Sequence, residues 1–166
     1  MGKKFELTDK FIINVFGIKL FQIKCTKSFK YAQKGDLGGY VEKEGNLDQE
    51  NDAWVSGDAR VYGDAQVSGD AWVYGNAQVS GNARVSGDAN IKNNNEHCGF
   101  DGFGSCNRHT HAYLTKEKKV EITCGCFRGS IEEFEKKVEE THSGTIYEKQ
   151  YKAIINVIKI KFGLTD

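Results

Sequence analysis

The sequence predicts a mainly β protein built around a parallel β-helix. Residues 55–91 repeat a six-residue unit six times without an insertion. A period of six is too short for a helix–turn–helix repeat and fits neither the 3.6-residue helical period nor a heptad. Three such units, each a short strand and a turn, make one triangular coil. A short hairpin before the repeats and a small α+β unit after them complete the expected architecture.

The residue types of the repeat suit the three-sided coil. The pattern is Val-x-Gly-(Asp/Asn)-Ala-x, closing on Ile91. Val is expected to point inward, Ala to lie near the corner, and Gly-Asp or Gly-Asn to form a turn at positive φ. The same phase, continued upstream from the Ala position, finds Ala53, Leu47 and Val41. A β-helix over residues 37–92, of about three coils, is therefore expected.

The six units resemble the hexapeptide-repeat family. The resemblance implies a left-handed coil, which the spacing does not show. It also implies assembly into trimers with the prisms side by side.

Residues 1–36 predict an N-terminal β cap. Phe11–Val15 and Ile18–Cys25 alternate well enough for a half-buried hairpin with its turn near Gly17. We expect this hairpin to plug the open end of the β-helix, because a bare terminal coil exposes a sheet edge.

Residues 93–166 predict a small ββαα unit. A Gly-rich loop extends to Cys106, and two strands are expected near residues 111–115 and 120–127. Ser130 with Glu133 forms a capping box for a helix to about residue 142. Thr145 begins a second helix with one apolar stripe, ending near residue 162.

Charge and composition exclude several classes. The formal net charge is zero, which removes the simplest argument for nucleic acid or a membrane as the partner. The charges are uneven, with eight Lys in residues 1–35 and ten acidic residues in 36–91. No apolar run is long enough to cross a bilayer, and Lys3-Lys4 is followed by no signal-peptide core. A cytoplasmic location and free cysteines are expected.

A wider resemblance covers most of the chain. Leu20–Lys24 and Lys34–Glu44, then Gly104-Ser105 and Cys124–Gly129 with Phe134, resemble a group of uncharacterised proteins carried by bacteriophages and prophages. The group has an arginine where this chain has Cys106. The resemblance implies a phage origin, the host cell cytoplasm and a two-part architecture, but no activity.

An acyltransferase is one alternative, since hexapeptide-repeat enzymes often use a general-base histidine beside the coils. Residues 36–96 contain no histidine, which also argues against a carbonic anhydrase with three histidines on its metal. An acyltransferase could still use His109, His111 or His142 from the C-terminal unit.

The cysteines offer two further alternatives. Cys98, Cys106, Cys124 and Cys126, with the nearby histidines, are enough ligands for zinc. Cys124-Gly-Cys126 lacks the two-residue gap of a zinc knuckle, so buried structural cysteines are favoured and no metal or cofactor is expected. A nucleophilic Cys126 ahead of the helix at residue 130, with His142 as base, is the other alternative.

An anion-binding site is a further possibility, and it requires no catalytic group and no metal. Gly125, Gly129 and the helix at residue 130 offer backbone N–H groups to a phosphate. Arg108 and Arg128 add positive charge. The predicted ligand set is completed by Ser105, His109, His111, Tyr113, Cys126 and His142. The alternative is that both arginines are solvated and the capping box only begins a helix.

Trp54 and Trp72 are expected to form an oligomer interface. Their spacing of one coil places them on the same outer face of successive turns. Two large aromatic side chains on a face of small residues are typical of a subunit contact, here a trimer.

The sequence therefore favours a non-catalytic, oligomeric binding protein of phage origin. The concrete hypothesis is anti-defence: sequestration of a nucleotide-like host signal, or a block on a host defence protein. A hexapeptide-repeat acyltransferase and a structural or assembly protein of the phage are the alternatives.

Overall fold

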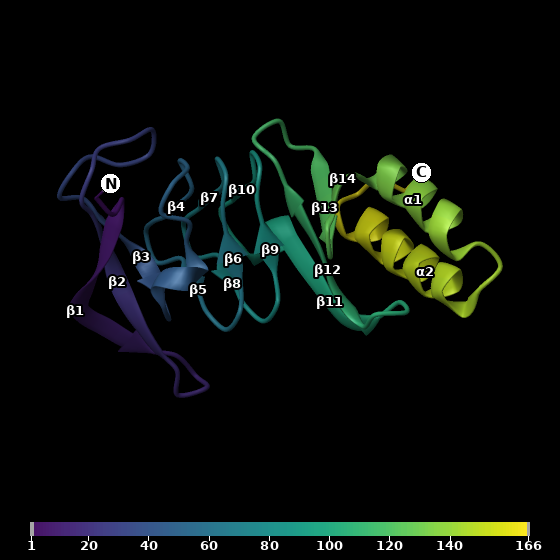
Figure 1. Cartoon of the computed structure of the whole chain (residues 1–166), viewed down its shortest axis with the longest axis horizontal. Coiled ribbons are helices and arrows are strands. Elements are labelled where there is room, and N and C mark those ends of the chain that lie inside the picture. The colour runs from purple at the N-terminus through teal and green to yellow at the C-terminus, as the bar shows by residue number, and fades with distance from the viewer. Residues whose placement is uncertain (1, 166) are drawn as a thin grey trace. The chain divides into compact units, whose positions relative to one another are not determined.

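The computed structural model describes residues 2–165, which divide into two compact units (Figure 1). The first unit ends at Asn94 and contains the N-terminal hairpin and the repeats. The second begins at Asn95 and contains a four-stranded sheet and two helices. Each unit has its own buried core, so each is described by itself.

Short parallel strands form the repeats of the first unit. They are β4 (Trp54–Val55), β5 (Arg60–Val61), β6 (Gln66–Val67), β7 (Trp72–Val73), β8 (Gln78–Val79), β9 (Arg84–Val85) and β10 (Asn90–Ile91). Strand β4 pairs with β7 and β7 with β10, while β5 pairs with β8 and β6 with β9. Partners are always three units apart in sequence, which is the period of a three-sided parallel β-helix.

The Val and Ala positions of the repeat form the interior. Every one of them from Val55 to Ala89 is at most 1% exposed. The turns are held by glycine at positive φ, and Gly57, at φ 64°, is an example. A Cβ added there would lie 3.2 Å from the backbone oxygen of Gly75 in the next coil. Both the backbone conformation and the close stacking of coils therefore require glycine.

The first coil departs from the predicted phase. Val41 pairs with Val61, and Leu47 bridges to Val67. Both residues therefore hold the inward Val position of the unit, and the expectation that they continue the Ala position is wrong. Two extra residues stand between Leu47 and Val55. Periodicity did not reveal them, because a shift of two residues leaves an apolar side chain on the same face of a strand.

A buried amide holds this irregular coil. Asn46 ends a short 3₁₀ helix (Glu44–Asn46) and is fully buried. Its Nδ2 donates to the backbone oxygens of Gly63, at 3.1 Å, and Ala65, at 2.8 Å. These bonds join the irregular coil to the next one, beside the single backbone bridge from Leu47 to Val67.

The N-terminal hairpin continues one sheet of the β-helix beyond its first coil (Figure 1). Strand β1 (Phe5–Ile13) pairs antiparallel with β2 (Lys19–Cys25), which pairs antiparallel with β3 (Leu37–Val41). Strand β3 in turn pairs parallel with β5, giving the sheet order β1-β2-β3-β5-β8. The hairpin is present, and it adds two strands at the end of the coil where the cap was expected. It pairs the backbone edge that β3 would otherwise expose.

An antiparallel meander and two helices form the second unit. Its elements are β11 (His97–Phe103), β12 (Arg108–Leu114), β13 (Val120–Cys124), β14 (Phe127–Ser130), α1 (Ile131–His142) and α2 (Ile146–Lys161), after a 3₁₀ turn at Asn94–Glu96. The sheet order is β11-β12-β13-β14.

The second unit is thus ββββαα, and the predicted ββαα pattern missed two strands. The Gly-rich segment after residue 96 is the strand β11, where Gly99 leaves room for a histidine of β12. The expected single strand over 120–127 is two strands joined at Gly125 and Cys126. Gly125 has a φ of 60°, which allows this tight turn. Glycine-rich composition predicts a loop, but Gly99 of β11 serves close packing against His109.

The helices begin where the capping residues predict. Ser130 accepts a hydrogen bond from the Glu133 N–H, and Thr145 accepts one from the Glu148 N–H. Both helices cover the same face of the sheet (Figure 1), and their apolar residues belong to one buried core with residues of the strands. The buried core between the sheet and the two helices consists of Ala112, Ile122, Cys124, Ile131, Phe134, Val138, Tyr151, Ile154, Ile155 and Ile158.

Neither α1 nor α2 could span a membrane. No helix within residues 2–165 combines the length and the apolar character that a crossing requires.

Candidate functional site

The sheet of the second unit has two different faces. One face packs against α1 and α2 through residues such as Ala112 and Ile122. Strand register places polar side chains from all four strands on the opposite face. They are His97, His109, His111, Tyr113, Glu121, Thr123 and Arg128. Three of the predicted ligand residues, His109, His111 and Tyr113, therefore share this face with Arg128.

A chain of hydrogen bonds links the histidines on this face. Asp101 Oδ1 lies 2.7 Å from His109 Nδ1, and His109 Nε2 lies 3.3 Å from His111 Nδ1. His111 Nε2 lies 3.2 Å from His97 Nδ1. This chain of histidines passes over β11 at Gly99. A Cβ added at Gly99 would lie 2.7 Å from His109 Nε2, so a larger residue would not fit there.

His111 is the buried middle of this chain. It is 3% exposed, and burial, with the neighbouring His97 and His109, holds its pKa well below the usual range. A neutral imidazole has one N–H donor and one acceptor nitrogen. His111 can therefore donate to His109 and accept from His97, while Asp101 accepts from His109. Such an assignment satisfies each contact without a ligand.

Tyr113 and Arg128 are joined to each other by a carboxylate. The Tyr113 hydroxyl donates to Glu121 Oε1 at 2.7 Å, and Arg128 Nε donates to the same oxygen at 2.8 Å. Tyr113 is fully buried. The positive charge of Arg128 is thus partly neutralised within the sheet, so this arginine is a weaker candidate for a phosphate than the sequence indicated.

The N-terminus of α1 is already capped. Ser130 and Glu133 exchange hydrogen bonds, from Ser130 N at 2.8 Å and from Glu133 N at 3.2 Å. A Cβ at Gly129 would lie 2.5 Å from Glu133 Oε2, so this carboxylate covers the glycine. Glu132 adds a second carboxylate to the first turn. These carboxylates take the place that the predicted phosphate would need.

Gly125 and the start of α1 lie at opposite ends of β14. The strand runs from Phe127 to Ser130 between them. The predicted anion site, which joined Gly125 to the helix N-terminus, therefore separates into two places. The cause is the tight turn after Cys124, which reverses the chain before the helix begins.

Five predicted ligand residues do gather at one end of the sheet. We call this the turn end; it comprises the turns 104–107 and 125–126 and the α1–α2 connection 142–145. The five are Ser105, Arg108, Gly125, Cys126 and His142. The Gly104 N–H donates to Gln150 Oε1 at 2.9 Å, which ties the first of these turns to α2.

Tyr151 lies beneath the turn end. Its hydroxyl is 3.8 Å from Cys124 Sγ, and its ring stacks on His142 with centroids 5.5 Å apart. Burial, and then Cys124, raises the pKa of Tyr151, so its hydroxyl stays protonated. A Cβ at Gly104 would lie 2.0 Å from this hydroxyl, so the turn packs directly on the ring.

Arg108 is the available cation of the turn end. It is exposed, and no carboxylate among residues 2–165 forms an ion pair with it. Its guanidinium lies beside the second turn, since a Cβ at Gly125 would lie 2.5 Å from Arg108 Nη1. The glycine therefore lets the arginine lie across the turn next to Cys126.

The cysteines lie in different surroundings. All five are free thiols, with Cys124 buried on the helix-facing side and Cys106 and Cys126 exposed in turns. Burial raises the pKa of Cys98. Within residues 2–165, no three His, Cys, Asp or Glu side chains are grouped so that they could hold a metal ion.

The two tryptophans of the first unit are covered by their own chain. Trp54 is 2% exposed, with Phe29 edge-on to its ring at 5.4 Å. The Trp72 ring stacks with Tyr31, at 5.3 Å, and with Tyr74, at 4.1 Å. The spacing correctly placed both outside the prism, but the expectation that both are exposed is wrong for Trp54. The segment 26–36 occupies the face that was assigned to a subunit contact.

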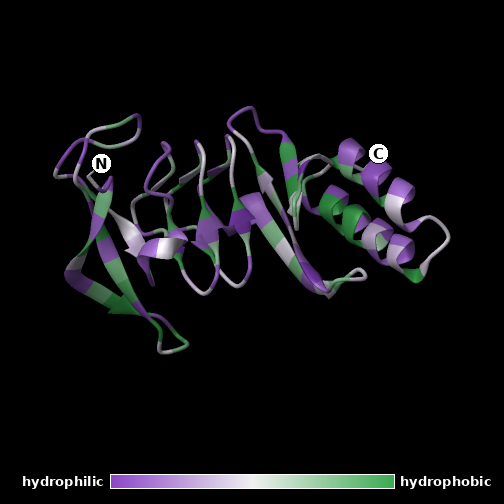
Figure 2. Cartoon of the chain, in the orientation of Figure 1, coloured by the Kyte–Doolittle hydropathy of each residue, from purple (hydrophilic) through white to green (hydrophobic). Residues whose placement is uncertain are grey.

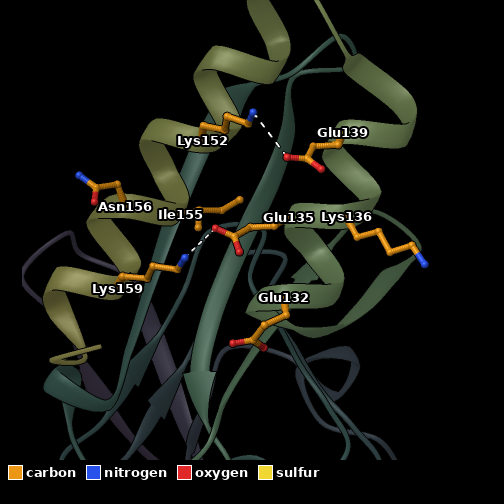
Figure 3. Close-up of a pocket in the computed structure, with 8 residues that line it drawn as sticks. All are labelled: Glu132, Glu135, Lys136, Glu139, Lys152, Ile155, Asn156 and Lys159. Atoms are coloured by element: carbon orange, nitrogen blue, oxygen red, sulfur yellow. Dashed lines mark hydrogen bonds and ion pairs between the residues drawn. The ribbon is translucent and has the colours of Figure 1, made fainter. Parts of the chain in front are cut away.

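A groove of about 510 Å³ runs between α1 and α2 (Figure 3). Two ion pairs cross it, Lys159 to Glu135 at 2.6 Å and Lys152 to Glu139 at 3.6 Å. Opposite charges on the two helices thus meet one another across the groove. We assign these pairs to helix pairing, where each contributes little.

Sequence reasoning missed Asp101, Glu121 and Tyr151. Asp101 and Glu121 are acidic residues that stand on strands beside the predicted histidine and tyrosine. The alternation of side chains along a strand could have identified Glu121, because it places Glu121 opposite Tyr113. Using that alternation required the correct strand boundaries. Tyr151 was assigned correctly to the apolar stripe of α2, and only the fold brings its hydroxyl to the turn end.

Comparison with known proteins supports the repeat architecture. A family model described as the YdcK beta solenoid repeat matches residues 53–69, 65–79 and 77–91. These residues cover β4 to β10. No curated protein sequence matches the chain. The chain therefore carries a β-solenoid whose repeats are similar to those of YdcK.

Proposed function

We propose that the protein is a non-catalytic binding protein of phage origin. In this proposal a left-handed β-helix of about three coils is the frame, and the turn end is the binding surface. The ligand is a nucleotide-like signal of the host, bound in the host cytoplasm, so that the protein acts against host defence. A homo-oligomer presents several such surfaces, and a host defence protein is the other ligand to be tested.

The exposed guanidinium of Arg108 is the observation that carries this proposal. It lies beside Gly125, and a planar guanidinium matches two phosphate oxygens at once. Ser105, Cys126 and His142 lie at the same end and add a hydroxyl, a thiol and an imidazole. This set of groups suits a ligand with a phosphate and several polar atoms.

The local charge supports an anionic ligand. Asp101 pairs with His109, and Glu148 pairs with Lys152 at 2.7 Å. Residues 102–116 and 122–131 contain no acidic side chain. The stretches of sequence that contain Arg108 and Gly125 therefore lack negative charge, which favours an anion.

Calorimetric titration with cyclic dinucleotides and ADP-ribose derivatives tests the proposal. We expect the wild type to bind one of them, and Arg108→Ala to weaken binding by about tenfold to a hundredfold, the loss typical of a charged hydrogen bond. Arg128→Ala is the matched control, because Arg128 is also an exposed arginine of the same sheet but is paired with Glu121. It should bind nearly as the wild type does.

Two results would overturn this assignment. An absence of heat with every nucleotide would exclude the nucleotide ligand. Equal losses for Arg108→Ala and Arg128→Ala would mean that the turn end is not the binding surface. Inorganic phosphate, added as a competitor, shows whether the phosphate group is what the protein recognises.

An acyltransferase is the second candidate, and one contact favours it. Asp101 holds His109 Nδ1 at 2.7 Å, as a carboxylate orients a general-base histidine. His109 Nε2, which would face the substrate, instead contacts His111. Failure to bind coenzyme A in the same titration would exclude this candidate. If the protein instead has a structural role in the phage, it should be found in purified phage particles.

A further inference from the structure

The hairpin tip between β1 and β2 is unusually apolar for an exposed turn. We use the name hairpin tip for residues 11–19. Within it, Val15 is 92% exposed, Phe16 73% and Ile13 63%, and Phe11 is 43% exposed at the base. Figure 2 shows this loop as largely apolar at the end of the hairpin. Four exposed apolar side chains within six residues form a patch that folding has left in water.

The turn itself does not require these side chains. Asn14 Oδ1 accepts hydrogen bonds from Phe16 N, at 3.0 Å, and Ile18 N, at 2.9 Å. The Gly17 N–H donates to the Asn14 backbone oxygen, and Gly17 has a φ of 79°. Asn14 and Gly17 thus make the turn, as these residue types commonly do. Val15 stands between them with its side chain in solvent, where a polar residue would serve the fold equally well.

Two lysines flank the hairpin tip. Lys10 precedes it and Lys19 ends it, while Asp9 is the one acidic residue within four positions of it in the sequence. Lys19 Nζ lies 3.9 Å from the centre of the Phe11 ring. The lysine side chain therefore lies along the apolar surface, with its ammonium group over this ring. Lys10 is exposed one residue before Phe11. An apolar tip with basic groups at its base matches an anionic bilayer, with its acyl chains below and its phosphates above.

We propose that the hairpin tip docks on an anionic phospholipid surface. Val15 and Phe16 enter the boundary between headgroups and acyl chains, while Lys10 and Lys19 contact lipid phosphates. The expectation from sequence, which left out a membrane, rested on a net charge of zero and on the lack of a spanning segment. A peripheral contact depends on local charge, and the basic and acidic residues of this chain are segregated.

A second copy of the chain fits the hairpin tip less well. A symmetric contact between two tips would bring Lys10 and Lys19 of both copies together, and like charges at such a contact oppose association. The tip is also a protruding turn, which offers another tip no groove to enter.

Co-sedimentation of the full chain with lipid vesicles tests the proposal. We expect binding to vesicles of phosphatidylglycerol mixed with phosphatidylcholine, little binding to phosphatidylcholine alone, and weaker binding as salt rises. The double variant Val15→Ser, Phe16→Ser should reduce binding at least about tenfold, because the apolar surface it removes has no replacement. Lys10→Gln with Lys19→Gln should reduce both binding and its salt dependence.

Leu164→Ser is the control for loss of an exposed apolar side chain, since Leu164 is 52% exposed in the other unit. It should bind vesicles as the wild type does. Circular dichroism should show each variant folded, because all the substituted side chains are in solvent.

Two outcomes would overturn the proposal. One is a wild type that ignores anionic vesicles, and the other is a Val15→Ser, Phe16→Ser variant that binds them unchanged. Sedimentation velocity supplies a third. If the double variant dissociates an oligomer while vesicle binding is absent, the hairpin tip is a contact between copies.

Discussion

Gly102 and Gly104 differ in what surrounds them, although both lie near the β11–β12 turn at positive φ, 80° and 75°. Nothing lies within 4 Å of a Cβ added at Gly102. At Gly104 the same atom would lie 2.0 Å from the Tyr151 hydroxyl. The first glycine is needed only for its backbone conformation, and the second also for close packing.

This pair gives the first prediction. Gly102→Ala should cost about 1 kcal/mol of unfolding free energy, the usual penalty for alanine at positive φ. Gly104→Ala should cost clearly more, because it must also displace Tyr151. Urea unfolding measures both, and Gly104→Ala combined with Tyr151→Phe should recover part of the difference. Equal costs for the two glycines would contradict the packing of the turn on Tyr151.

Lys4 is the buried ammonium group of the first unit. It is 5% exposed, and its Nζ donates to the backbone oxygens of Asn51, at 2.5 Å, and Ala53, at 2.8 Å. These carbonyls belong to the segment where the coil has its two extra residues. Burial lowers the pKa of Lys4 to about 8, from an ordinary value of 10.5. The Lys-rich N-terminal segment is therefore not only a solvated surface, since one of its lysines is structural.

The second prediction follows from that pKa. Between pH 8 and 10.5 the unfolded chain keeps the proton of Lys4 while the folded chain has released it. Stability contributed at this site therefore rises with pH across that window and is constant below it. The unfolding free energy of the wild type minus that of Lys4→Met should increase over the window. Lys24→Met, which removes an exposed lysine, is the control, and a flat difference for Lys4→Met would contradict the low pKa.

At the scale of elements, the segment 26–36 decides the environment of both tryptophans. Tyr31 stacks on Trp72, and its hydroxyl donates to the Asp70 backbone oxygen at 3.0 Å. Phe29 packs on Trp54. The aromatic spacing in the repeats predicted an outer stripe, and the chain itself supplies the aromatic residues that cover it. A loop of mixed composition gives no periodic signal, so this contact could not be predicted from sequence.

The third prediction concerns this cover. Tyr31→Ala should lower the unfolding free energy by about 1–3 kcal/mol, through the lost stacking and area. It should also shift tryptophan emission to longer wavelength, because Trp72 gains contact with water. Tyr31→Phe keeps the ring and loses only the hydrogen bond, so most of the emission change should vanish. Unchanged emission in Tyr31→Ala would mean that the segment does not cover Trp72.

At the scale of the whole molecule, the two units carry separate spectroscopic probes. Both tryptophans of the chain belong to the first unit, and both α-helices found in residues 2–165 belong to the second. Ile23 and Ile158 are fully buried, one in each unit. Tryptophan fluorescence therefore reports the first unit, and helical circular dichroism reports the second.

The fourth prediction is that each core responds by itself. Ile23→Ala should lower the urea midpoint followed by fluorescence, and Ile158→Ala the midpoint followed by circular dichroism. Each should cost about 2–5 kcal/mol, as usual for a buried isoleucine. The probe of the unsubstituted unit should keep its midpoint. If both midpoints move together in both variants, the chain unfolds as one cooperative unit.

The sequence by itself determined the regular parts of this protein. A period of six with inward Val and Ala predicts the coil, and caps at Ser130 and Thr145 predict both helices, because these signals depend only on neighbours in the chain. Tertiary structure alone decided the rest. The fold placed two extra residues in the first coil and covered Trp54 with a neighbouring segment. It also separated Gly125 from the start of α1 and left Arg108 exposed beside Gly125. Such outcomes depend on which distant groups meet, and local patterns do not record the partners of a side chain.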